Sequence, residues 1–182
     1  MARLPYNTRD ALEGEALAAW NEIAGDRDRL TLVTNLLMYD PPMALLSEKL
    51  SHAVRFETAV PFKDVELVVL IIAREFDCLR EWAVHIAQAR RAGVSEDAIE
   101  AIKSRRAPDG LDDNDTLYFH YTRQLLQKHR VDEDVFKALH AQLGDKGIVD
   151  LTELIGHFSG LAAVMNAFEV EPPEDPDLLL PV

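Results

Sequence analysis

Apolar residues recur at three- and four-residue spacing along most of the 182 residues, and this pattern is the strongest constraint on the fold. Such spacing lines apolar side chains along one side of an α-helix, and the strict alternation typical of strands is hard to find. Glycine, which weakens helices, occurs only 8 times. The sequence therefore predicts an all-α protein of about eight or nine helices.

Prolines, glycines and capping residues divide the pattern into expected helices. Asn7 or Thr8 can cap a first helix, which ends at Gly25, and Ser95 can cap a short helix after Gly93. The remaining helices are expected over residues 30–38, 43–57, 61–74, 78–92, 114–128, 132–143 and 149–168. We expect one helical domain over residues 1–168 and an acidic, proline-rich tail over 169–182, which is either extended over the surface or across a subunit boundary, or disordered.

The segment from Val65 to Ala73 is the most apolar in the chain, and Glu66 is its only charged residue. Because the run is too continuous for a half-exposed helix, we expect it at the centre of the core. A carboxylate buried there requires a hydrogen-bonding or cationic partner, and burial by itself raises a carboxyl pKa. Glu66 is therefore a candidate functional residue.

The next expected helix carries four candidate residues within about 100° of one another on one side, at helical geometry. They are Cys78, Glu81, Trp82 and His85. Glu81 and His85 are four residues apart, the spacing of a side-chain contact along a helix, although a solvated Glu/His contact has the same spacing. If the two central helices pack antiparallel, Glu66 and His85 can meet as a proton-transfer pair.

These residues resemble the motif of the carboxymuconolactone decarboxylase and alkylhydroperoxidase D-like family. Glu66 is followed after eleven residues by Cys78-Leu79-Arg80-Glu81-Trp82-Ala83-Val84-His85, and then by Ala92-Gly93-Val94-Ser95. The resemblance is strongest from Pro61 to Ile102, within a family core at residues 43–104. It implies a single-domain helical fold with a buried central helix pair, assembled into homotrimers or homohexamers.

The peroxidase branch of that family carries a second cysteine at the position of Glu81. A dithiol couple needs two sulfurs, and this chain has one cysteine, so peroxidase chemistry of that type is not expected. The sequence resembles more the decarboxylase branch, which acts on a lactone acid of aromatic catabolism without metal or organic cofactor. The resemblance then implies a carbon–carbon lyase that acts on a small organic acid or lactone.

On this hypothesis His85 is the general acid and base, because histidine can protonate a carbanion near neutral pH. Glu66 orients it or relays its proton, and Glu81 is a second acid facing the pocket. Cys78 lines the pocket or is an inert core cysteine. Trp82 forms a pocket wall or belongs to the core.

Three further residues are candidates for binding substrate. Arg80 lies on the same turn as the site and can hold an anion, although a surface arginine has the same pattern. His52 can reach the pocket from the preceding helix, or lie at the surface. His157 lies in a nearly apolar helix and is a pocket residue or a hydrogen-bonded core histidine.

Composition limits the other function classes. There are 32 acidic and 19 basic residues, a net charge of −13, so nucleic acid is not an expected partner. Neither a secretory signal nor a membrane span is evident, and we expect a cytoplasmic protein without a membrane partner. A metal site built from Glu66, Glu81, His85, His52 and His157 is disfavoured, because no recognised ligand spacing is present.

Two alternatives to the decarboxylase remain open. The first is a redox protein that uses Cys78 with an external thiol or another subunit, which would require a lowered thiol pKa. The second is a helical oligomer that binds a small ligand without catalysis.

Overall fold

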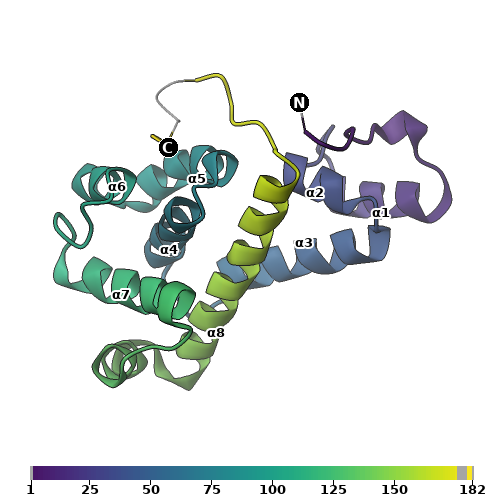
Figure 1. The fold of residues 1–182 in the computed structure, drawn as a ribbon. Coiled ribbons are helices and arrows are strands. Elements are labelled where there is room, and N and C mark those ends of the chain that lie inside the picture. The colour runs from purple at the N-terminus through teal and green to yellow at the C-terminus, as the bar shows by residue number, and fades with distance from the viewer. Residues whose placement is uncertain (1, 176–179, 182) are drawn as a thin grey trace.

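Helix α4 (Phe62–Glu75) lies at the centre of the molecule, because its own apolar side chains point to all sides and must all be buried. The computed structural model describes residues 2–175 and 180–181, and all regular structure within these residues is helical. Residues 64–74 of α4 are all buried, including Glu66. Helices α5, α7 and α8 pack around α4 (Figure 1). The predicted all-α class and the central position of this helix are confirmed.

Helices α4 and α5 (Leu79–Ala92) form an antiparallel pair joined by a tight turn. Asp77 adopts a left-handed backbone conformation with φ 47°, and the Cys78 amide donates to the Ala73 carbonyl at 2.8 Å. Helix α5 ends at Gly93, which has φ 96°. The side chain of Ser95 then accepts a hydrogen bond from the Ala98 amide and caps α6 (Glu96–Lys103), as predicted.

The C-terminal half consists of α7 (Asp113–Lys128) and the long α8 (Glu133–Ala167). Two separate helices are expected here, over 132–143 and 149–168. The division is confirmed, because α8 consists of two helical segments that meet at a kink at Gly144, whose φ of 67° and ψ of −176° leave the helical region, and the second segment begins directly after this glycine. Glycine adopts this conformation without strain, so the chain changes direction there without a loop.

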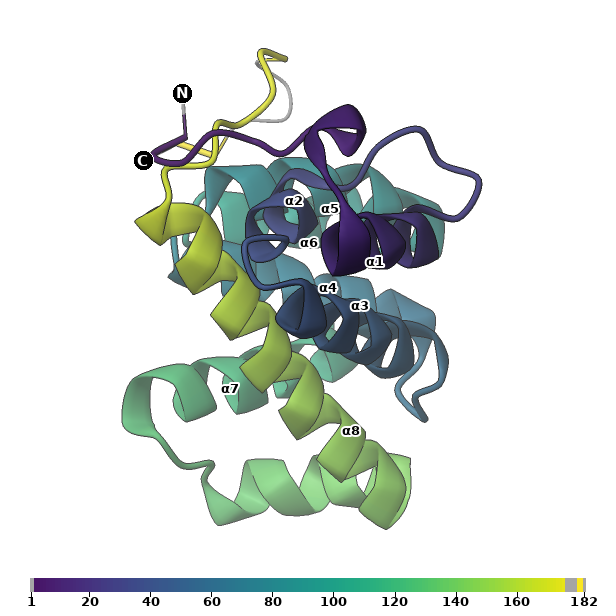
Figure 2. The same ribbon diagram turned by 90° about the vertical axis from the view of Figure 1, so that its right-hand side faces the viewer.

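The N-terminal region forms a second, smaller apolar cluster around Trp20 and Ile23 beside the main core. Its helices are α1 (Gly14–Ala24), α2 (Leu32–Leu37) and α3 (Pro41–Phe56), preceded by a 3₁₀ turn, η1 (Arg9–Ala11). The expected first helix capped at Asn7 or Thr8 is wrong, because α1 begins at Gly14 and Thr8 makes no side-chain cap. Figure 2 shows α1, α2 and α3 stacked beside α8.

The N-terminal segment lies beside the C-terminal end of α8 (Figures 1 and 2). The Arg3 amide donates to the Phe168 carbonyl at 2.8 Å, and Val170 is buried. Residues 170–175 form no helix, in agreement with an extended tail. Farther on, Arg74 donates to the Pro181 carbonyl at 2.7 Å, so the tail returns to the core. Residues 176–179 and 182 of the expected tail lie outside the described residues.

Among the residues described, α8 is the one helix whose length and composition would allow it to cross a membrane. Its side chains Leu151, Leu154 and Ile155 are buried in the main core. The helix packs against α4 and α7, as a core helix does.

Candidate active site

A cavity of about 860 Å³ lies between α3, α5, α8 and residues 27–34. Its volume falls within the range of cavities that bind small molecules. Glu81 and His85 of α5 and Phe158 of α8 line it, and α3 contributes Ser51 and Arg55. The central helix pair thus presents its polar residues to a space large enough for a small organic molecule.

The predicted pair of Glu66 and His85 forms as the antiparallel packing requires. His85 Nδ1 lies 2.7 Å from Glu66 Oε2, and both side chains are buried. The rings of Phe158 and His85 are nearly perpendicular, with centroids 5.4 Å apart. Glu66 therefore holds Nδ1 of the His85 ring by a hydrogen bond, and the other ring nitrogen, Nε2, points away from Glu66.

Arg55 of α3 completes the pair from the opposite side. Its Nη2 donates to Glu66 Oε1 and to Gln88 Oε1, each at 2.7 Å. Burial by itself raises the pKa of Glu66, but the hydrogen bonds and charges of His85 and Arg55 outweigh burial and hold that pKa below its usual value. The sequence-based expectation of a raised pKa for Glu66 is therefore wrong, because it did not include Arg55.

Glu81 lies on the other side of the imidazole, with Oε1 3.5 Å from His85 Nε2. Burial raises the pKa of Glu81, and the charges of His85 and Arg55 offset this only in part. His85 therefore lies between Glu66, whose pKa is lowered, and Glu81, whose pKa is raised. This arrangement suits proton transfer, because the two acids differ in pKa.

Two predicted residues of the α5 face lie away from the cavity. Cys78 is 1% exposed at the N-cap of α5, and burial, with the charge of Glu81 adding to it, raises its pKa to about 11. Trp82 is fully buried in the main core. Neither is among the residues that line the cavity, so the structure gives both the core position that the sequence left as their alternative.

The three candidate binding residues lie in different environments. Arg80 lines the cavity, as the hypothesis required. His157 approaches it through Ser51, whose Oγ lies 2.7 Å from His157 Nε2. His52 is not brought to the site, since its side chain is 62% exposed, contacts Glu57 and packs on Phe56.

Residues 41–124, which contain α3 to α6 and most of α7, match the model of the carboxymuconolactone decarboxylase family. Over these residues the chain carries the sequence pattern of this family. No curated protein matches the sequence. Two solved structures share the fold at 15% identity and cover 95% of this chain. One is an alkylhydroperoxidase AhpD core, an uncharacterized peroxidase-related protein from Ralstonia eutropha JMP134 (TM-score 0.78, 93% of that chain). The other is an uncharacterized peroxidase-related protein from Silicibacter sp. TM1040 (TM-score 0.75, 92% of that chain).

Most of the positively charged residues of the site could not be identified from the sequence. Arg27, Arg29 and Arg55 line the cavity together with Arg80. Arg27 pairs with Glu48, whereas Arg29 and Arg80 form no ion pair among the residues described. Periodicity indicates that Arg55 lies on a helix, but no local spacing relates it to Glu66, eleven residues later.

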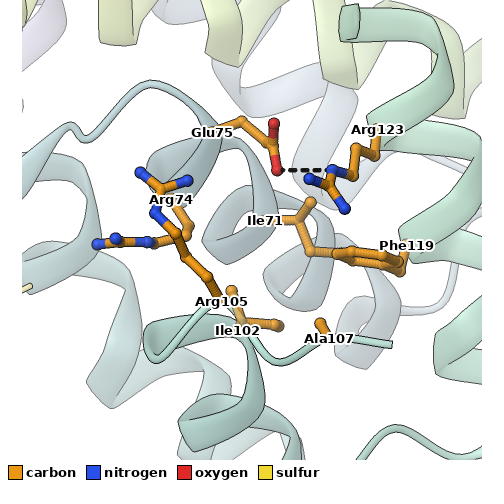
Figure 3. Close-up of a pocket in the computed structure, with 8 residues that line it drawn as sticks. All are labelled: Ile71, Arg74, Glu75, Ile102, Arg105, Ala107, Phe119 and Arg123. Atoms are coloured by element: carbon orange, nitrogen blue, oxygen red, sulfur yellow. Dashed lines mark ion pairs between the residues drawn. The ribbon is translucent and has the colours of Figure 1, made fainter. Parts of the chain in front are cut away.

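A second, much smaller cavity of about 30 Å³ lies away from this site, between α4, α6 and α7. Figure 3 shows Ile71, Ile102 and Phe119 around its centre and the Glu75–Arg123 ion pair at its rim. The space suffices for a water molecule only. In the described part of the chain, no group of three or more His, Cys, Asp or Glu residues is arranged to hold a metal ion.

Proposed function

We propose that the protein is a cofactor-free decarboxylase that acts on a small anionic organic acid or lactone. The observation that carries this proposal is the chain of Glu66, His85 and Glu81, with His85 Nδ1 2.7 Å from Glu66, at the wall of a cavity of about 860 Å³. The cavity also holds the cations that an anionic substrate needs, although the whole chain has a net charge of −13.

In this mechanism Arg29 and Arg80 bind the anionic groups of the substrate, since both line the cavity without an ion pair in the described residues. The carbon–carbon bond to the departing carboxylate breaks, CO₂ leaves, and the bonding electrons remain on the substrate as a dienolate-like carbanion. His85 donates the Nε2 proton to carbon, and the nearby Glu81 carboxyl restores it. Glu66, held by Arg55, stabilises the imidazolium form that donates this proton, and the Glu81 carboxylate regains its own proton from water.

The single-cysteine redox alternative receives less support. A reactive thiol is exposed and has a lowered pKa, whereas Cys78 is buried and its pKa is raised to about 11. The non-catalytic alternative, a helical protein that binds a small ligand, shares the cavity but assigns no role to the Glu66–His85 contact.

We also propose that the protein acts as a homo-oligomer, a trimer or hexamer as the family resemblance implies. Three apolar side chains on one stripe of α3 support a contact with a second copy. They are Met43, Leu46 and Leu50, which are 51%, 64% and 39% exposed. Exposed apolar groups at this spacing are typical of a helix face that another surface covers.

CO₂ release from a panel of lactone acids and β-keto acids tests the proposed function. We expect one class of acid to be turned over by the wild type, and by His52→Ala, whose histidine lies outside the cavity. Glu66→Gln and His85→Ala are expected to lower turnover by about 10²- to 10⁴-fold, the usual contribution of acid–base groups. Absence of turnover of every acid by the wild type would favour the non-catalytic alternative, and equal turnover by wild type and His85→Ala would contradict the role of His85.

A further inference from the structure

A second pair of polar side chains meets at the same cavity on the other side of Phe158. Ser51 Oγ and His157 Nε2 are 2.7 Å apart, and Ser51 lines the cavity. The Phe158 ring is nearly perpendicular to both histidine rings, with centroids 5.4 Å from His85 and 5.6 Å from His157. Ser51 and His157 therefore form a contact separate from the Glu66–His85 pair.

The chemistry of this contact suits a nucleophile and its base. Burial lowers the pKa of His157, which favours the neutral imidazole that can accept the Ser51 proton. Ser51 stands between His157 and the cavity, so a bound molecule meets the hydroxyl first. Arg55 follows Ser51 by one helical turn on α3, lines the same cavity and supplies positive charge for a developing oxyanion.

We propose that Ser51 and His157 form a dyad that hydrolyses carboxylic esters of small acids. Ser51 Oγ attacks the ester carbonyl carbon while His157 Nε2 takes the hydroxyl proton. The carbonyl–oxygen bond then breaks, and His157 gives that proton to the departing alkoxide, which leaves as the alcohol. Water attacks the acyl-serine with His157 as base, and the acid leaves as Ser51 regains its proton.

This activity shares the cavity and Arg55 with the proposed decarboxylation, but its proton transfers use neither Glu66 nor His85. Within the described residues His157 Nδ1 has no carboxylate partner, so the pair lacks the third member of a full triad. We therefore expect slow turnover and a preference for esters with good leaving groups.

Hydrolysis of 4-nitrophenyl acetate by the full-length protein tests the proposal. Ser51→Ala and His157→Gln are each expected to lower the enzyme-dependent rate by about 100-fold, the lower range for a general base. Ser47→Ala is the matched control. It removes a serine hydroxyl from the same helix and the same cavity wall, one turn earlier, and is expected to keep the wild-type rate.

Labelling of the wild type with phenylmethylsulfonyl fluoride gives a test that does not depend on how the variants fold. Peptide mass spectrometry is expected to find the sulfonyl adduct on Ser51 and not on Ser47. The proposal is overturned if the wild type carries no adduct on Ser51, or if folded Ser51→Ala hydrolyses the ester at the wild-type rate.

Discussion

His85 contacts two buried carboxyl groups, Glu66 and Glu81, whose pKa values are shifted in opposite directions. Glu66 and Glu81 are both removed from water, but only Glu66 receives a guanidinium hydrogen bond, from Arg55 at 2.7 Å. Burial disfavours the charged form of both groups, and Arg55 with His85 reverses this for Glu66 alone. The close contacts of His85 and Arg55 with Glu66 thus set the difference in pKa between the two acids that acid–base chemistry requires.

Glu66→Gln is expected to destabilise the protein near neutral pH by roughly 1–3 kcal/mol, because Arg55 loses its buried anionic partner. The folded-state pKa of Glu66 is lowered, so its stabilising contribution is present above the unfolded pKa and is lost as pH falls through the folded pKa. Urea unfolding at several pH values measures this. The difference from wild type should shrink in acid, and a difference that grows in acid would contradict the assignment.

Glu81→Gln is expected to have the opposite sign. The folded-state pKa of Glu81 is raised, so wild-type stability falls as pH rises from the unfolded pKa toward the folded pKa. Glutamine has no such charge to bury, and the variant should be more stable than wild type at pH 8. The same urea series checks this, with Glu66→Gln as the matched comparison, and a loss of stability at pH 8 would show that Glu81 is held as a charged group.

At the scale of helices, the lining of the site depends on how α3 and α8 cross α4 and α5. Periodicity, prolines and caps predicted α4, α5 and α6 well, because these helices follow strong local signals at Pro61, Gly93 and Ser95. The Glu66–His85 contact followed from the antiparallel pair. Arg55 and the Ser51–His157 contact did not, because they join helices far apart in sequence and depend on tertiary packing.

Two glycines of α8 are expected to respond oppositely to alanine. Gly144→Ala should cost about 1–3 kcal/mol, since φ 67° and ψ −176° lie in a region that alanine avoids. Gly156→Ala should stabilise the protein by at most about 1 kcal/mol, because this helical position is open and a new Cβ meets no atom within 4 Å. Thermal and urea unfolding measure both. Stabilisation by Gly144→Ala would show that the bend is not required.

At the scale of the whole molecule, the cavity faces the side of α3 that carries Ser51 and Arg55, and the exposed stripe lies on another side of the same helix. Oligomer formation through the stripe would therefore leave the cavity-lining residues in place. Four arginines line the cavity together with Asp28, Glu48 and Glu81, so the lining is less acidic than the chain as a whole, as binding of a small anion needs.

The mass in solution tests the proposed assembly. Light scattering should give a multiple of the 20.5 kDa protomer for the wild type. Leu46→Glu with Leu50→Glu should lower that mass by placing charge in the contact. Phe136→Glu is the control, because Phe136 is also exposed but lies on α8, outside the stripe. A monomeric wild type would contradict the assembly.

The measurement that tests the central claim most directly is decarboxylation of a turned-over acid in D₂O, followed by NMR. The mechanism predicts one deuterium at the carbon that lost CO₂, delivered by His85, and a rate about 10²- to 10⁴-fold lower for His85→Ala. Deuterium delivery and turnover at the wild-type rate in folded His85→Ala would contradict the account.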